Sequence, residues 1–408
     1  MTYLYLDTAR IGQMTPGAQA AHSDFARLVG RMGASVPVEE LLRSGFSSCR
    51  SLVDGEYPGL ECWQGIAAFK RLLREQAGFR SELPVLVSSR SAVLMQFAAR
   101  ELVKRCRMVL TTDLTWPAYS EIFRAECRRQ GRESVCLHLG TEILHRNESE
   151  DSIAERLVGC FHDMQCDGIF LTSVSSQGGR LPITRVVDSV RRYCQFVVVD
   201  GAQDYCHVGA DVDDGVADLY LAGCHKWLGA YYPLGLAFFG REETAQELEE
   251  AVREQLLDCQ DALSTDPLLQ FVEDLEQGKR RSTGETVNAS NLFGVAGALS
   301  DAQGQGPLKA RLRIRQSNAD VLAPAIESKG WEVRIPRDQL RSGVMLIKPR
   351  GRAQPNWRCG DTLRKEASRL GVALSAYDRG LIRLSMPDWH FTDGQLQRIQ
   401  QVFSQLRL

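Results

Sequence analysis

The sequence predicts an α/β fold, with a large domain built on a mostly parallel seven-stranded sheet between helices and a small α+β domain at the C-terminal end. In the middle of the chain, short apolar runs alternate with longer segments of helical periodicity, as in βαβ units. Beyond about residue 305, strands follow one another between helices. A chain of 408 residues, 44% of them hydrophobic and 25% charged, can bury a core of this size.

The apolar runs that we expect to form the large sheet are short and bounded by polar or turn residues. They cover residues 85–88, 108–111, 134–139, 168–172, 196–199, 219–222 and 236–239. The helical patterns between them cover residues 91–105, 118–130, 151–164 and 184–192. Helices cover both faces of a parallel sheet, and ligands bind beyond the carboxyl ends of its strands. Functional side chains are therefore expected just after these runs.

The C-terminal part of the chain has a different pattern. A charged, helix-rich stretch covers residues 242–276, and Gly304 and Pro307 mark a break. The segments that follow predict helices from about residue 310, at 360–370 and at 392–406, and strands at 331–335, 343–347, 371–374 and 381–384. We therefore expect a large domain over residues 21–305 and a small domain over residues 306–408.

Composition excludes several classes of function. The net charge of −2 leaves no basic surface for nucleic acid, and no run of about 18 apolar residues could span a membrane. The N-terminus lacks the basic and apolar regions of a signal peptide. The 12 cysteines show neither paired C-x-x-C motifs nor zinc-ligand spacing. These features predict a cytoplasmic protein without a metal site.

The most informative residues are one aspartate and one lysine at the ends of two apolar strands. The strand at 196–199 leads into Asp200, and the strand at 219–222 is followed by His225 and Lys226. Alone, such an aspartate is usually a turn or cap residue, and such a lysine usually reaches solvent. Together they can hold pyridoxal 5'-phosphate, because the lysine amine forms a Schiff base and the carboxylate keeps the pyridine nitrogen protonated. Lysine is also rare here, with 8 among 49 basic residues.

These motifs resemble those of the class V aminotransferase family, the fold type I enzymes that include cysteine desulfurases and isopenicillin N epimerase-like proteins. The sequence DGAQ from Asp200 to Gln203 is similar to the family's DxxQ/H strand end, and CHKW around Lys226 is similar to its (S)GHKW motif. The resemblance implies that Lys226 forms the Schiff base, that Asp200 contacts the pyridinium and that Gln203 lies near the ring hydroxyl. Weaker matches extend from Tyr5 to Ser385.

The resemblance also implies how the cofactor phosphate and ring are held. Ser89, Arg90 and Ser91 follow a strand and open a helix, whose free amides could bind the phosphate, although helix capping is the ordinary role of such serines. Many relatives carry a phosphate-binding serine where Gly223 stands, and His225 or a group from the partner subunit is expected to take over that contact. Trp116 is expected to stack on the ring, the alternative being a core tryptophan.

Four further residues are assigned through the resemblance. Ser176 replaces a family asparagine near the ring hydroxyl and is shorter, which puts the reaction in doubt. Thr286 is expected to reach the partner's phosphate in a homodimer with shared active sites, or else to cap a helix. Arg383, in a motif similar to R-x-S, is expected to bind the substrate α-carboxylate unless it forms a structural ion pair. Arg10 lies in segment 1–20, which covers the site in relatives.

The reaction is less determined than the cofactor. We favour β-elimination from an amino acid or cysteine S-conjugate (C–S lyase activity) or decarboxylative deamination, and the opening YLDTAR resembles enzymes of lincosamide-like antibiotic tailoring. Amino transfer and epimerisation are the alternatives. A desulfurase needs a nucleophilic cysteine shortly before the R-x-S arginine, and residues 371–383 contain none, while Cys359 lies before a helix. A non-catalytic scaffold is disfavoured because Lys226 is present.

Overall fold

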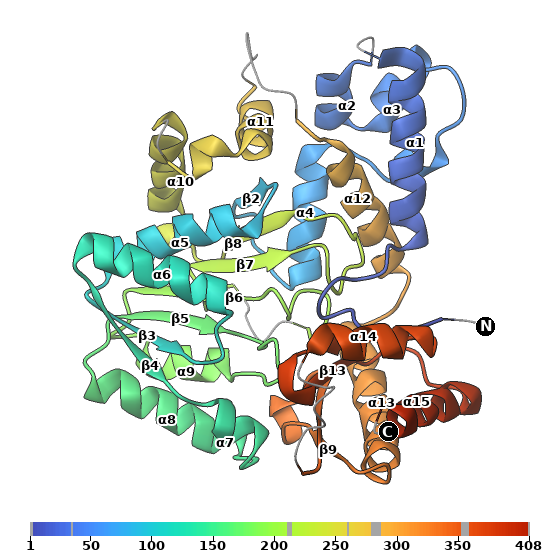
Figure 1. Ribbon diagram of the computed structural model, residues 1–408. Coiled ribbons are helices and arrows are strands. Elements are labelled where there is room, and N and C mark those ends of the chain that lie inside the picture. The colour runs from blue at the N-terminus through green and yellow to red at the C-terminus, as the bar shows by residue number, and fades with distance from the viewer. Residues whose placement is uncertain are drawn as a thin grey trace.

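The computed structural model describes residues 3–33, 36–209, 214–258, 261–278, 287–351 and 359–406. A large α/β part fills one side of the molecule, and the C-terminal helices and strands pack against it at the other (Figure 1). Thr286, one of the predicted cofactor contacts, lies outside the described residues.

The large sheet has seven strands in the order β2-β8-β7-β6-β5-β3-β4. Only β8 runs against its neighbours, so the expected mostly parallel seven-stranded sheet is confirmed. Each predicted run is found within two residues of its expected bounds. The strands are β2 Val85–Ser88, β3 Met108–Thr112, β4 Glu133–Leu137, β5 Gly168–Thr172, β6 Phe196–Asp200, β7 Leu219–Gly223 and β8 Gly235–Phe239.

Helices cover both faces of this sheet, which explains why its central strands are apolar throughout. Along β6, Phe196 and Val198 pack in one buried cluster, whereas Val197 and Val199 pack in another on the opposite face. One face is covered by α5 Ser91–Arg105, α6 Pro117–Gln130 and α10 Glu242–Leu257, and α11 Pro267–Glu276 contributes side chains to the clusters on both faces. The other is covered by α1 Pro16–Met32, α2 Val38–Ser44, α3 Phe46–Cys49, α4 Ile66–Ala77, α7 Gly140–Leu144, α8 Glu150–Asp163, α9 Ile183–Val190 and α12 Ser290–Gln303.

The C-terminal part is an α+β unit with its own apolar cluster. Its antiparallel sheet has the order β12-β13-β10-β9, and a two-stranded parallel sheet joins β1 to β11. The strands are β1 Leu4–Tyr5, β9 Trp331–Arg334, β10 Val344–Pro349, β11 Val372–Ala373, β12 Ser375–Ala376 and β13 Ile382–Ser385, and the helices are α13 Leu308–Glu327, α14 Gly360–Arg369 and α15 Asp393–Gln405. We propose the division into segments 1–20, 21–305 and 306–408 on this basis.

The described helices include none that combines the length and the apolar composition needed to cross a bilayer. Within the same part of the chain, no group of three or more His, Cys, Asp or Glu side chains is arranged to hold a metal ion.

Candidate active site

A cavity of about 550 Å³ lies beyond the carboxyl ends of the parallel strands. This is where ligands bind in open α/β sheets. It is lined by nine of the twelve residues singled out from the sequence, namely Arg10, Ser91, Trp116, Ser176, Asp200, Gln203, His225, Lys226 and Arg383. A larger cleft beside α4 and α10 contains none of the twelve, and its buried Lys70 is paired with Glu273 and Glu276.

Asp200 and Lys226 lie at the floor of the cavity because two adjacent strands end there. Asp200 is the last residue of β6 and is 3% exposed, and Lys226 follows β7 by three residues. Burial raises the pKa of Asp200, against the Ala202 N–H that donates to its Oδ1 atom at 3.0 Å and the charge of Lys226. Burial lowers the pKa of Lys226 to about 8, so its amine loses its proton more readily near neutral pH than an ordinary lysine does.

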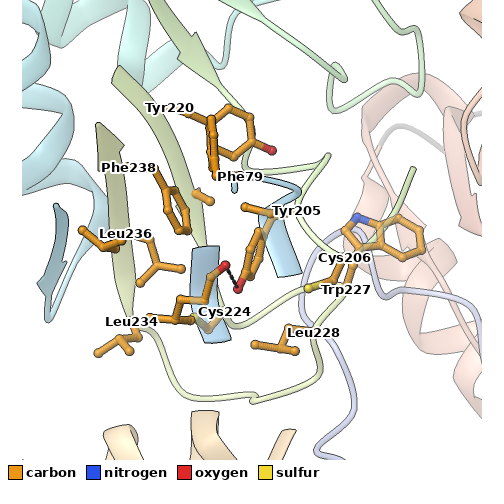
Figure 2. Close-up of a cluster of buried hydrophobic side chains, with 14 of the residues drawn as sticks. Phe79, Tyr205, Cys206, Tyr220, Cys224, Trp227, Leu228, Leu234, Leu236 and Phe238 are labelled. Carbon is orange, nitrogen blue, oxygen red and sulfur yellow. Dashed lines mark hydrogen bonds between the residues drawn. The ribbon is translucent and has the colours of Figure 1, made fainter. Parts of the chain in front are cut away.

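An apolar cluster supports the loop that carries Lys226. Figure 2 shows Tyr205, Tyr220, Cys224, Trp227 and Leu228 among the side chains of this cluster. Such close packing on both sides of Lys226 restricts the loop, and the lysine side chain remains directed to the cavity that it lines.

Gln203 lines the cavity and also makes two hydrogen bonds within the protein. Its Oε1 atom accepts a hydrogen bond from Trp227 Nε1 at 2.8 Å, and its Nε2 atom donates to the Ala9 carbonyl at 2.7 Å. One amide N–H remains for a ligand in the cavity. Gln203 therefore ties the N-terminal segment to the lysine loop, and its place near the ring hydroxyl stays a prediction.

The structure brings Ser91 to the cavity but not Ser89 or Arg90. The N–H and hydroxyl of Ser89 both donate to Asp266 Oδ2, at 2.9 and 2.6 Å. The Arg90 side chain is exposed and absent from the cavity lining. The assignment of Ser89 to the phosphate is thus corrected, because a carboxylate distant in sequence already occupies the Ser89 donors. The assignment of Arg90 stays a prediction that rests on its backbone amide at the start of the helix.

Trp116 and His225 both line the cavity. Trp116 precedes α6 and is 49% exposed, so its ring forms an open wall of the cavity rather than part of the core. Burial, and next the charge of Lys226, lowers the pKa of His225 to about 4, which keeps the imidazole neutral. Its Nδ1 atom is buried without a partner, and this nitrogen could form a hydrogen bond with a ligand, as a donor in the tautomer that carries the proton there.

Arg383 enters the cavity from β13 of the small sheet and is 3% exposed. It donates from Nη1 to the Ser176 carbonyl at 3.1 Å and from Nη2 to the Ser375 hydroxyl at 3.0 Å. Its Nε–H is buried and unpartnered. A buried guanidinium with an open donor edge suits a planar carboxylate.

Several cavity residues were not found from the sequence. Thr172, Ser375, Tyr377 and Arg364 also line it. No motif marks these positions. Ser375 and Tyr377 reach the site only through the pairing of β12 with β13, which the order of residues along the chain does not reveal.

The N-terminal segment connects the two halves of the site. Ala9 N–H donates to the Ser385 hydroxyl at 2.8 Å on the side of Arg383, and Gly12 N–H donates to the His225 carbonyl at 2.7 Å on the side of Lys226. Arg10 lies between them, half exposed, with Nη1 3.8 Å from Asp7 Oδ2. The placement agrees with the expectation that this segment covers the site.

Gly12 permits the close approach of this segment to the lysine loop. A Cβ atom at Gly12 would collide with the Lys226 carbonyl oxygen and lie 3.2 Å from the Gly229 Cα atom. We expect Gly12→Ala to lower the free energy of unfolding by about 1–3 kcal/mol and to weaken cofactor binding. Urea denaturation measures the free energy of unfolding, and cofactor titration measures the affinity for the cofactor. In the control Gly30→Ala, the new Cβ meets no atom within 4 Å. Equal losses of stability and cofactor affinity in the two variants would contradict the role of the close approach at Gly12.

Comparison with known proteins agrees with this geometry. The family model described as aminotransferase class-V matches residues 163–252, the segment that contains Asp200 and Lys226. No curated protein matches the chain. Among solved structures, the cysteine desulfurase CsdA of Escherichia coli aligns with a TM-score of 0.70 and 14% identity, over 99% of this chain and 94% of that one.

Two other solved structures have the same fold. The cystine C–S lyase C-DES aligns with a TM-score of 0.69 and 12% identity, over 98% of this chain and 97% of that one. Alanine–glyoxylate aminotransferase of a Nostoc species aligns with a TM-score of 0.66 and 14% identity, over 100% of this chain and 96% of that one. The fold is thus that of the fold type I pyridoxal-phosphate enzymes. The family match in the lysine segment, residues 163–252, confirms the resemblance that the motifs around Asp200 and Lys226 carry.

The residues present fit this cofactor. The cavity offers an amine with a lowered pKa, a buried carboxylate with one backbone donor, and the unpartnered Nδ1 atom of His225. Lys226 would hold the aldehyde carbon and Asp200 the ring nitrogen, with Ser91 and His225 as candidates for the phosphate. Bound there, pyridoxal phosphate supplies an electron sink for negative charge that develops at the substrate Cα atom.

Proposed function

We propose that this enzyme removes the Cα proton of an amino acid and expels a substituent from Cβ, with cysteine S-conjugates as the substrate class. The supporting observation is that Lys226 and Arg383 line one cavity in which, among the described residues, no cysteine takes part. Arg383 binds the α-carboxylate, and the Lys226 amine accepts the Cα proton. A desulfurase would need a thiol in this place.

Cys224, two residues before Lys226, and Cys359, which precedes the helix before Arg383, do not meet that need. Cys224 is fully buried, and burial raises the pKa of its thiol well above the ordinary value. Cys359 is exposed and does not line the cavity. A nucleophilic thiol requires a lowered pKa and access to the substrate. Elimination needs neither, since the sulfur leaves with the electron pair of the Cβ–S bond.

The overall conversion is balanced by one water molecule. A cysteine S-conjugate and water give a thiol, pyruvate and ammonium, with no acceptor or oxidant. Trp116, 49% exposed, and Tyr377, 39% exposed, line the cavity and could contact an apolar substituent on sulfur.

The test is to supply the holoenzyme with S-benzyl-L-cysteine and no keto acid, and to follow cofactor absorbance, pyruvate and thiol. We expect the absorbance to recover while pyruvate and thiol accumulate in equal amounts over many turnovers. A single conversion of the cofactor that stops without pyruvate would instead establish amino transfer, the second candidate, which the family match supports. Release of CO₂ would identify decarboxylative deamination, and inversion at Cα without release would identify an epimerase.

We also propose that two copies of the chain share their active sites in a cytoplasmic homodimer. The half-exposed Trp116 supports this, because a partner could close the open wall of the cavity. The YLDTAR opening supports a role in antibiotic biosynthesis. Sedimentation velocity of the holoenzyme would measure the oligomeric state.

A further inference from the structure

The Arg383 guanidinium is held by both terminal nitrogens. Antiparallel pairing of β12 with β13 places Ser375 directly opposite Arg383. Nη2 donates to the Ser375 hydroxyl and Nη1 to the Ser176 carbonyl, at 3.0 and 3.1 Å. The Nε–H is the donor left without a partner. These bonds fix the plane of the guanidinium with one edge unoccupied.

A carboxylate lies directly behind this arginine. Asp7 Oδ1 is 3.9 Å from Arg383 Nη2, too far for a hydrogen bond, and accepts the hydroxyl hydrogen of Ser375. Ser375 thus stands between the two charges, donating to one and accepting from the other. Asp7 is 6% exposed and Arg383 3%, so a direct ion pair would be poorly screened and strong.

The chain around Asp7 keeps this carboxylate in place. Leu6 N–H donates to the Ala373 carbonyl, and its own carbonyl accepts from Ser385 N–H at 2.8 Å. Ala9 N–H donates to the Ser385 hydroxyl. The nearby Arg10 is half exposed and 3.8 Å from Asp7 Oδ2, and it neutralises the carboxylate only weakly. Asp7 is therefore a fixed competitor for Arg383.

We propose that Ser375 is a positioning residue whose hydroxyl keeps Arg383 from pairing with Asp7, so that the guanidinium stays available to the substrate carboxylate. The proposal rests on the proposed function only in assigning that carboxylate to Arg383. Without the hydroxyl, a shift of about 1 Å brings Nη2 within the ordinary bonding distance of Asp7. The Asp7 carboxylate, hydrogen-bonded to Arg383, then competes with the substrate carboxylate for the guanidinium.

The test compares carboxylate recognition in variants of the holoenzyme. L-alanine and alaninamide, which lacks the carboxylate, are titrated while the absorbance of the bound cofactor is followed. We expect Ser375→Ala to weaken L-alanine binding about tenfold and alaninamide binding less than about twofold. The double variant Asp7→Asn/Ser375→Ala should recover L-alanine binding to within about threefold of the unaltered enzyme, because the competing charge is gone.

The remaining variants exclude a purely structural effect. Ser375→Thr, which retains the hydroxyl, should bind L-alanine like the unaltered enzyme. Asp7→Asn alone should bind it at least as tightly, and it tests the proposal even when Ser375→Ala does not fold. The control Ser342→Ala removes another buried serine, which donates to the Gly178 carbonyl at 2.7 Å, and should leave both affinities unchanged.

Two results would overturn the positioning role. One is unchanged L-alanine binding in Ser375→Ala, and the other is a double variant that binds L-alanine no better than the single variant. Failure of the carboxylate assignment in the proposed function gives a different result, since Arg383→Ala would then bind L-alanine as tightly as the unaltered enzyme does.

Discussion

Lys226→Ala is expected to abolish turnover while leaving a folded protein. Lys226 is the one lysine that lines the cavity in the described part of the chain, and its lowered pKa makes an uncharged amine easier to reach than for an ordinary lysine. Loss of a positioned proton carrier costs about 10²–10⁴ in rate, and loss of the covalent attachment of the cofactor adds to this. Steady-state rates and the visible spectrum of the purified variant measure both effects.

Lys70→Ala is a matched control for this variant. Lys70 is also buried, but it is paired with Glu273 and Glu276, away from the cavity. Its removal leaves two carboxylates partly unpaired and should cost about 3–5 kcal/mol of stability with little change in cofactor absorbance. The assignment would fail if Lys226→Ala kept the absorption band of the lysine-bound cofactor, or if Lys70→Ala lost it.

The large sheet and the residues at its strand ends were predictable because their signals are local. A strand buried on both faces must be apolar along its length, so Phe196, Val197, Val198 and Val199 mark β6 without knowledge of its neighbours. Asp200 then lies at the carboxyl edge of the sheet, where ligands bind. These signals lie within a few residues of the site they predict.

Contacts between distant segments were not predictable in this way. Nothing near Ser89 indicates that Asp266 will accept its hydrogen bonds, and nothing near Gln203 indicates that Ala9 and Trp227 will occupy its amide. Each of these contacts depends on how segments far apart in sequence pack. Residue type and strand-end position predicted which side chains approach the cavity, and the packing of remote segments decided which of them remain free to bind.

The second large effect is expected for Asp200→Ala, which should lower the rate by at least about a hundredfold while some cofactor still binds. Asp200 is 3% exposed, and burial raises its pKa, although the backbone N–H that donates to it acts in the opposite direction. A protonated ring nitrogen beside it would stabilise the buried carboxylate, and the carboxylate in turn would hold that proton. Without the Asp200 carboxylate, the pyridine ring loses its proton and its positive charge, and it accepts electrons poorly.

The chain offers a matched control for the loss of this buried carboxylate. Asp218 is also fully buried, but its side chain accepts from Val197 N–H at 2.7 Å and pairs with Arg241 at 3.1 Å, at the opposite end of the strands. Asp218→Asn should cost about 1–3 kcal/mol of stability and leave the rate per folded molecule unchanged.

A pyridoxal phosphate methylated at the ring nitrogen carries a permanent positive charge, and it should restore part of the rate of Asp200→Ala. An equal loss of rate in both aspartate variants, or no gain from the methylated cofactor, would show that Asp200 acts through packing and not through the charge of the ring.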